Sequence, residues 1–131
     1  MEEIQQEKKL YRILHEIAIA IRETDSISSA ANYLLDVARS ATGAETGSLM
    51  LINERDELYV LAARGLPAEG LNTYRTRIGE GISGIVAQRR EPVVVQDVDR
   101  YPEFADSLRG HYKTRSFISC PVLFKNKLLG V

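Results

Sequence analysis

The sequence predicts an α+β fold with two N-terminal helices followed by an antiparallel sheet. Leu10, Leu14 and Ile17 recur at steps of four and three residues, which is the spacing of one helix face. From Thr46 onward, apolar side chains instead follow the two-residue period of β-strands. Short polar turns, such as residues 53–57, connect these strands, which is typical of hairpins and therefore of antiparallel pairing.

Length and composition indicate one globular domain. The chain has 131 residues, of which 44% are hydrophobic and 27% charged, as is ordinary for a folded domain. It has no apolar run near the ~18 residues of a membrane span, and its first residues lack the basic-then-apolar pattern of a secretory signal. The single cysteine, Cys120, excludes an internal disulfide and a multi-cysteine metal site. We therefore expect a cytoplasmic protein, or the cytoplasmic part of a larger one, with no membrane partner.

Charge is divided unevenly between the two halves of the chain. Residues 1–63 hold six Lys and Arg against eleven Asp and Glu, whereas residues 64–131 hold eleven against seven. The simpler interpretation of this division is that the two halves form two solvated faces. The alternative is that the second half of the chain binds an anionic partner. Nucleic acid is not expected as that partner, because the basic residues are scattered instead of clustered on one predicted helix.

The first predicted helix, residues 3–23, extends past the core that a small domain can form. Ile4 lies too far upstream for such a core to cover it, and Leu10 and Leu14 extend past it in the same way. A helix of this kind pairs with a copy of itself or frays as a terminus, and the sequence leaves both open. We expect a homodimer through residues 1–23, with the same helix transmitting a signal.

A second helix is predicted from Ile27 to about Thr42. Asp25 or Ser26 can cap its start by accepting a hydrogen bond from a free backbone N–H. Gly43 can close it in the left-handed conformation. The expected inward face consists of Ile27, Ala31, Leu34, Ala38 and Ala41.

Six strands and one short helix are expected in the rest of the chain. A loop over residues 97–114, with one helical turn near Glu103–Arg109, precedes the fifth strand, and loops of this length in small domains are often functional. The predicted strands are Thr46–Asn53, Leu58–Arg64, Thr73–Ile78, Val93–Gln96, Ser116–Phe124 and Lys127–Val131, and the helix is Ile82–Arg90.

The glycines at positions 79, 81 and 84 match the spacing of a dinucleotide-binding loop, but their context does not. That loop follows a buried strand inside a parallel βαβ unit. Here the preceding residues, Tyr74–Ile78, are polar and the neighbouring strands form hairpins. We expect these glycines to shape a turn and to leave the start of the short helix open to an anion.

No catalytic or metal-binding constellation is expected. His15 and His111 lie far apart in the sequence, and neither has the ligand spacing of a metal site. Cys120 precedes Pro121 in an apolar strand, which is typical of an unreactive core thiol. The sequence therefore predicts a protein that is not an enzyme, and it identifies no cofactor.

Taken in order, these features resemble those of a GAF domain, a small sensory module of signalling proteins. The resemblance covers nearly all of residues 10–131. The segments that carry it are Ala41–Ala44, Gly47–Ile52, Ala62–Leu66, Gly79–Ala87, Glu91–Asp97, Asp99–Phe104, Arg115–Val122 and Leu128–Val131.

The resemblance implies a six-stranded antiparallel sheet in the order 3-2-1-6-5-4. The N-terminal helices would cover one face, and the short helix and the long loop would cover the other. A ligand pocket is then expected between the sheet, the Ile82–Arg90 helix and the Asp97–Thr114 loop. The candidate lining residues are Met50, Arg64, Ile82, Val86, Val95, Asp97, Phe104, Phe117 and Ser119.

This sequence differs from family members that carry a recognisable ligand-binding signature, and the differences restrict which ligands are expected. The signature of cyclic-nucleotide binders would begin beyond the last strand, and Cys120 lacks the setting of a bilin attachment site. His111 lies where some haem-binding members hold their ligand, which leaves haem ligation open. Reduction of free methionine sulfoxide, a chemistry of some relatives, needs several cysteines.

The resulting hypothesis is a regulatory sensor domain, residues 1–131, of a larger signal-transduction protein. Such a protein would be a histidine kinase of a two-component system, a cyclic-dinucleotide enzyme or a transcription activator. A small molecule or a partner domain would shift the population of two states, and the terminal helices would relay that state to an output domain. The alternative is a dimerisation or protein-interaction module without a ligand. Because the chain reaches Val131 inside a strand, we expect a GAF domain truncated at its C-terminus.

Overall fold

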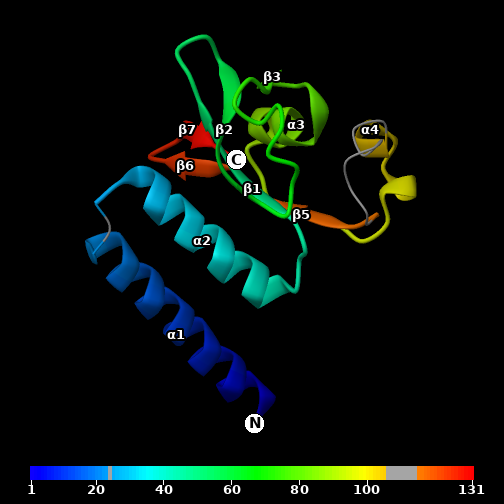
Figure 1. The fold of residues 1–131 in the computed structure, drawn as a ribbon. Helices are drawn as coiled ribbons and strands as arrows, with labels where there is room; N and C mark the ends of the chain where they lie inside the picture. The colour runs from blue at the N-terminus through cyan, green and yellow to red at the C-terminus, as the bar shows by residue number, and fades with distance from the viewer. Residues whose placement is uncertain (24, 106–114) are drawn as a thin grey trace.

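The computed structural model describes residues 1–23, 25–105 and 115–131. Two long helices precede a series of short strands, and a third helix lies among these strands in the sequence (Figure 1). The elements in chain order are α1 (Glu2–Glu23), α2 (Ile27–Thr42), β1 (Gly47–Ile52), β2 (Glu57–Arg64), β3 (Arg75–Arg77), α3 (Gly81–Arg89), β4 (Val93–Val95), the 3₁₀ turn η1 (Val98–Arg100), α4 (Pro102–Ala105), β5 (Phe117–Ser119), β6 (Val122–Phe124) and β7 (Lys127–Gly130).

Helix α2 begins and ends where the sequence predicts. The Ser26 hydroxyl accepts a hydrogen bond from the backbone N–H of Ser29 at 3.1 Å. This satisfies one of the donors that the first turn of a helix leaves free. At the other end, Gly43 adopts a φ of 74°, and its N–H donates to the Arg39 carbonyl at 2.8 Å.

Replacing the capping Ser26 by alanine is expected to lower the free energy of unfolding by about 1 kcal/mol, because the Ser29 N–H loses its acceptor. The Ser40→Ala variant, on the same helix, is the control and should change this value by less than about 0.5 kcal/mol. Urea denaturation of both variants measures the difference. Equal midpoints for the two would show that the cap does not stabilise α2.

The inward face of α2 differs from the prediction. The helix buries Ala31 and Leu35, whereas Ile27 is 65% exposed. Ala38 and Ala41 are exposed as well. The next position on the buried face, four residues after Leu35, is Arg39, whose aliphatic stem lies against Gly47 of β1. A long charged side chain can cover apolar surface in this way while its head stays in water.

The main sheet has the order β3-β2-β1-β7-β6, with antiparallel pairing throughout. A β-bulge follows Leu49, which lies opposite Ala62, whereas Met50 lies opposite Val60. Because the bulge inserts a residue, these two pairs face opposite sides of the sheet. Leu49 and Ala62 pack with α2, and Met50 and Val60 pack with Ala87 of α3.

The expected six-stranded sheet is wrong in one respect, since the structure divides it. The predicted strand Ser116–Phe124 forms two short strands, β5 paired with β4 in a separate two-stranded sheet and β6 paired with β7. Pro121 lies between them and has no N–H to donate to a ladder, so pairing stops there. Cys120 is exposed beside this break, and the expectation that it lies in the core is therefore wrong.

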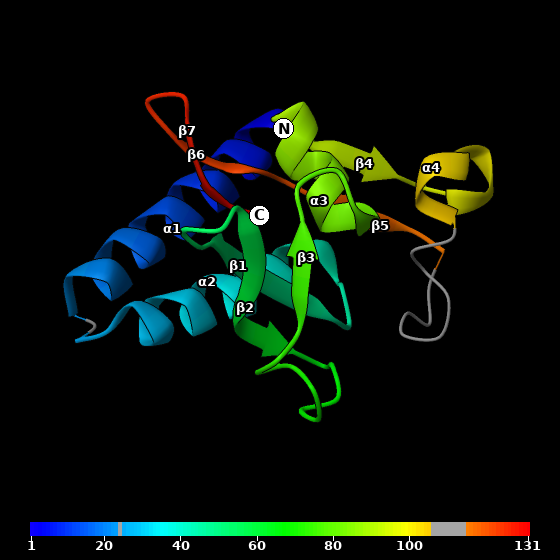
Figure 2. The same cartoon turned by 90° about the horizontal axis from the view of Figure 1, so that it is seen from above.

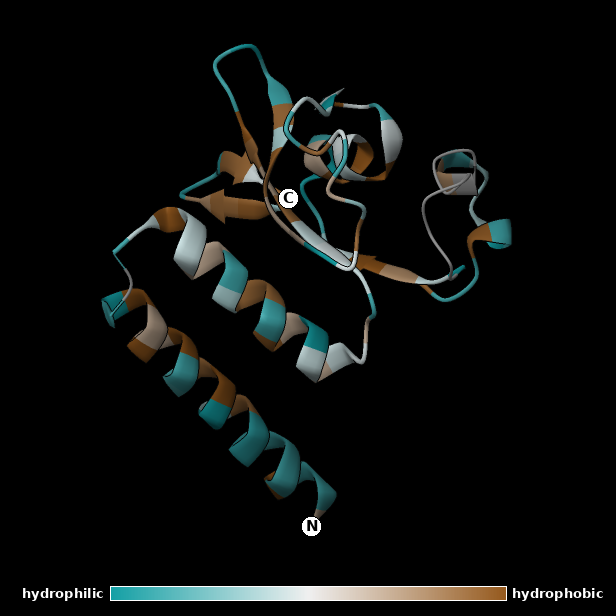
Figure 3. Cartoon of the chain, in the orientation of Figure 1, coloured by the Kyte–Doolittle hydropathy of each residue, from teal (hydrophilic) through white to brown (hydrophobic). Residues whose placement is uncertain are grey.

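The helices and the sheet form layers. Helix α2 packs on one face of the main sheet and α3 on the other, and α1 lies beyond α2, farther from the sheet (Figure 1). Helix α1 has no buried residue, and apolar segments along it are coloured brown in Figure 3. Among the described residues, no helix is both long and apolar enough to cross a membrane.

Candidate functional site

Four of the nine candidate residues meet on the α3 side of the fold. Val95 and Phe104 are buried, and Ile82 and Phe117 pack against them. The rings of Phe104 and Phe117 lie 5.2 Å apart at an interplanar angle of 83°, which is the edge-to-face geometry that aromatic pairs favour. We call these four residues the aromatic cluster. It joins α3, β4, α4 and β5 where the two sheets separate.

Asp97 lies at the border of the aromatic cluster and organises the turn after β4. Its carboxylate accepts a hydrogen bond from the backbone N–H of Asp99 at 3.0 Å. The Arg115 guanidinium lies 3.8 Å from the Asp97 carboxylate and also pairs with Asp99. The Arg115 carbonyl in turn accepts from the N–H of Val98 at 2.9 Å. These contacts fasten η1 to the start of β5.

A second ion pair fastens α4 to α3. Arg89 Nη2 donates to Glu103 Oε1 at 3.1 Å, and the same guanidinium lies 5.4 Å from the centroid of the Phe104 ring. A cation over an aromatic face is attracted to it. A hydrogen bond from its own backbone amide, and then the bond from Arg89, lower the pKa of the Glu103 carboxyl below its ordinary value.

The lowered pKa of Glu103 gives a pH dependence with a definite sign. Because the folded-state pKa is below that of the unfolded chain, this carboxylate stabilises the fold fully above the unfolded pKa, and the effect is lost as pH falls through the folded pKa. NMR titration of Glu103 should show this lowered pKa. In Arg89→Gln it should rise towards the ordinary value without reaching it, since the backbone bond remains. An unchanged pKa in Arg89→Gln would show that the Arg89 contact is not formed in solution.

The remaining candidates lie outside the aromatic cluster. Met50 packs with Leu58 in the core between β1, β2 and α3. Val86 is completely buried in α3, and Ser119 is half-buried at the end of β5. Arg64 pairs with Asp36 of α2 at 2.9 Å, so this candidate faces the opposite side of the sheet.

The glycine-rich segment before α3 has the structural role that the sequence predicts. Gly79 and Gly81 have φ values of 91° and 66°, which glycine adopts without strain. A Cβ at Gly84 would lie 2.2 Å from the Arg77 carbonyl oxygen, so the helix touches β3 at this point. The preceding strand β3 is an antiparallel edge strand, which is not the context of a dinucleotide-binding loop. Glu80 makes no side-chain cap, so the start of α3 is open.

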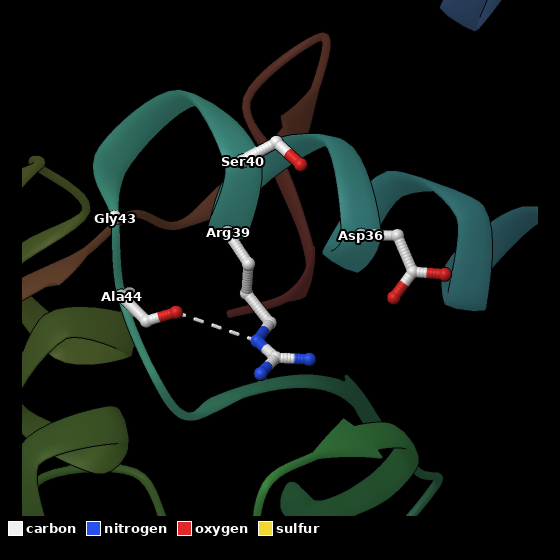
Figure 4. Close-up of a pocket in the computed structure, with 5 residues that line it drawn as sticks. All are labelled: Asp36, Arg39, Ser40, Gly43 and Ala44. Carbon is white, nitrogen blue, oxygen red and sulfur yellow. Dashed lines mark hydrogen bonds between the residues drawn. The ribbon is translucent and has the colours of Figure 1, made fainter.

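A polar hollow of about 330 Å³ opens at the C-terminal end of α2. Arg39 crosses it and donates to the Ala44 carbonyl at 3.4 Å (Figure 4). The same guanidinium donates to the Glu45 carbonyl at 2.7 Å. Asp36, on its border, is paired with Arg64. The charged groups at this hollow thus already have protein partners. The residues that line it, Asp36, Arg39, Ser40, Gly43 and Ala44, include none of the candidates from the sequence.

The described part of the chain contains no group of three His, Cys, Asp or Glu residues that could hold a metal ion. His15 is exposed on α1. His111, the candidate haem ligand, lies outside the described residues, as does most of the predicted helical turn near Glu103–Arg109.

Comparisons with known proteins agree with this architecture. A family model described as "GAF domain" matches residues 24–131. The chain is 27% identical over 122 residues to a Nif-specific regulatory protein of Herbaspirillum seropedicae, a match that covers 90% of this chain and 22% of the relative. This chain therefore spans about a fifth of that relative's length.

Two solved structures extend the comparison. The GAF domain from an Acinetobacter phosphoenolpyruvate-protein phosphotransferase superposes with a TM-score of 0.77 at 24% identity, covering 96% of this chain and 73% of that chain. A free methionine-R-sulfoxide reductase from Neisseria meningitidis, solved in complex with its substrate, gives a TM-score of 0.74 at 25% identity, covering 93% of this chain and 70% of that chain. A GAF domain of a phosphotransferase and a methionine-R-sulfoxide reductase thus share this fold.

Proposed function

The chain belongs to the GAF domain family, and on that premise we propose that it acts as a regulatory sensor domain of a larger signal-transduction protein. One observation carries this proposal. The match covers 90% of this chain but only 22% of the Nif-specific regulatory protein. A domain that forms a small part of a larger regulatory protein is suited to control an output domain of that protein. We place this proposed role in the cytoplasm.

We place the proposed ligand site at the aromatic cluster and its border. Phe117 and Ser119 of β5 are partly accessible there, and Phe104, which contacts Phe117, is completely buried. The cluster is held by two ion-pair systems, Arg89 with Glu103 and Arg115 with Asp97 and Asp99. These ion pairs could adopt two arrangements, which would be the two states of the sensor. A ligand would shift the population towards the state that it binds more tightly, and the size of the shift would depend only on the difference between its affinities for the two states.

Native mass spectrometry and a thermal-shift screen test the sensor proposal. The chain, purified from cells, is expected to carry a small molecule, or to melt at a higher temperature with one of the mononucleotides or haemin used as probes. If nothing co-purifies and no probe raises the melting temperature, the sensor proposal fails for this domain.

The proposed role is non-catalytic. The resemblance to a methionine-R-sulfoxide reductase makes an enzyme the competing class, but a thiol reductase of free methionine sulfoxide needs more than one cysteine, and the chain has only Cys120. A reductase assay with free methionine-R-sulfoxide is expected to show no turnover above background. Turnover that disappears in Cys120→Ser would overturn the non-catalytic assignment.

The second candidate function is an interaction module without a ligand. The observation that favours it is the apolar side chains that α1 exposes, among them Leu10 and Leu14, which are 56% and 53% exposed. This candidate does not exclude the first, because a sensor that dimerises can use the same helix to transmit its state.

A further inference from the structure

Three basic side chains gather at the turn that joins β6 to β7. Lys125 lies in this turn and Lys127 follows it as the cross-strand partner of Phe124. The turn projects from the edge of the main sheet (Figure 2). The third basic side chain comes from the end of α3, because the Arg90 guanidinium donates a hydrogen bond to the Asn126 carbonyl. We call Arg90, Lys125 and Lys127 the basic tip.

Uncharged groups hold two members of the basic tip in place. Arg90 is bound to a backbone carbonyl, and the Lys125 ammonium lies 5.5 Å from the centre of the Phe124 ring. Arg89, the residue before Arg90, by contrast forms an ion pair with Glu103. Within the described residues, no carboxylate forms an ion pair with any member of the basic tip. Its positive charge is therefore not compensated in that part of the chain.

The sequence around the basic tip supplies little negative charge. From residue 107 to residue 131 the chain has five Lys and Arg and no Asp or Glu. Glu91, which follows Arg90, is exposed and forms no ion pair with it. The sequence leaves open an anionic partner for the second half of the chain, and the basic tip is a place where such a partner finds cations held together.

Two of these cations occupy backbone positions that glycine fills without strain. Arg90 ends α3 with a φ of 57°, and Lys125 has a φ of 47°. A left-handed residue after a helix is most often glycine, and a hairpin turn with positive φ at both residues favours asparagine and glycine. The backbone alone therefore does not explain an arginine and a lysine at these positions, which points to a role for their side chains.

We propose that the basic tip binds an acidic segment of a partner protein. Carboxylates of that segment would pair with the two lysines and with Arg90, which uses one of its five N–H donors for Asn126. Leu123 and Phe124, which are 42% and 60% exposed, would contact an apolar side chain of the same segment. Because Arg90 and Lys125 are already held in place, binding would cost less side-chain entropy. This interaction goes beyond the sensor function and does not depend on it.

A protein segment fits the basic tip better than other anions do. A projecting turn is convex, whereas sites for small molecules are concave. Proteins that bind nucleic acid neutralise many phosphates, but the described part of the chain gathers three cations at this turn. A lipid surface needs a second anchor when so few cations attract it. An acidic protein segment needs only a few carboxylates and adds an apolar contact to them.

Fluorescence anisotropy tests the proposal with a labelled Glu-Glu-Leu-Glu-Glu peptide. The chain is expected to bind this peptide, more weakly as salt is added, and not to bind the uncharged analogue Gln-Gln-Leu-Gln-Gln. Phosphatidylglycerol vesicles and duplex DNA are the probes for the other two classes of partner. The proposal is wrong if the acidic peptide does not bind, or if the basic tip binds vesicles or DNA more tightly than the peptide.

Substitutions at the basic tip can remove its charge and still suit the backbone. Arg90→Gly and Lys125→Asn introduce residue types that tolerate a positive φ, so both variants should melt within a few degrees of the wild type. Combined with Lys127→Gln, they are expected to weaken binding of the acidic peptide roughly tenfold or more. Unchanged binding in this triple variant would overturn the proposal.

A second triple variant controls for net charge. Lys8→Gln, Lys9→Gln and Arg55→Gln together remove the same number of charges from exposed positions on α1 and in the turn between β1 and β2. This variant should change binding of the acidic peptide less than about twofold. If the two triple variants lose affinity equally, net charge and not the basic tip drives binding, and the proposal fails.

Discussion

Replacing Phe104 by alanine is expected to lower the free energy of unfolding by about 3–5 kcal/mol. Phe104 is completely buried and contacts the edge of the Phe117 ring. Its loss would leave a cavity between α3, β4 and β5 that these short elements cannot close. It would also remove the ring under the Arg89 guanidinium.

Tyr101 provides the control for this substitution. Its ring lies 6.3 Å from that of Phe104, but Tyr101 is 37% exposed, so Tyr101→Ala should cost about 1 kcal/mol or less. Chemical denaturation of both variants gives the comparison. A loss below about 1 kcal/mol for Phe104→Ala would mean that the aromatic cluster is not a packed part of the core.

The second large effect is expected at Gly130, where β7 meets β1. A Cβ at this position would lie 1.9 Å from the Met50 carbonyl oxygen. Met50 exchanges two backbone hydrogen bonds with Val131, at 2.8 and 2.9 Å, so the two strands cannot separate without losing them. Gly130→Ala is therefore expected to destabilise the fold by about 3 kcal/mol or more.

Gly47, in β1 of the same sheet, is the matched control for Gly130. A Cβ there would make ordinary contacts, the nearest at 3.6 Å to the Leu35 side chain. Gly47→Ala should then change the free energy of unfolding by less than about 0.5 kcal/mol. If both alanine variants unfold at the same denaturant concentration, β7 does not lie as close to β1 at Gly130 as described.

The elements that the sequence predicts well are those determined by neighbouring residues. The cap at Ser26 and the left-handed Gly43 both act within a few residues of the helix they end, so α2 is predicted almost to the residue. The glycines before α3 also follow from local geometry, since their positive φ values shape the turn.

The features that the sequence predicts poorly depend on contacts between distant segments. Pro121 is visible in the sequence, but the separation of β5 from β6 also depends on which strand pairs with each of them. Leu35 is buried on the inward face of α2, where the sequence predicts Leu34. The difference arises because packing against the sheet sets the rotation of the helix about its axis. Arg64, a candidate for the pocket, lies two residues after Ala62 on β2, so it shares the face that α2 covers and pairs there with Asp36.

In the proposed sensor, a small molecule binds at the aromatic cluster and its binding there is the signal. Ser119 and Ile118 are neighbours on β5 that face opposite sides of their sheet. The most direct measurement is therefore the thermal shift produced by the mononucleotides and haemin in the wild type, Ser119→Phe and Ile118→Phe. A probe that raises the melting temperature of the wild type is expected to raise that of Ile118→Phe as well, but not that of Ser119→Phe. An equal shift in all three proteins, or none in any of them, would contradict this expectation.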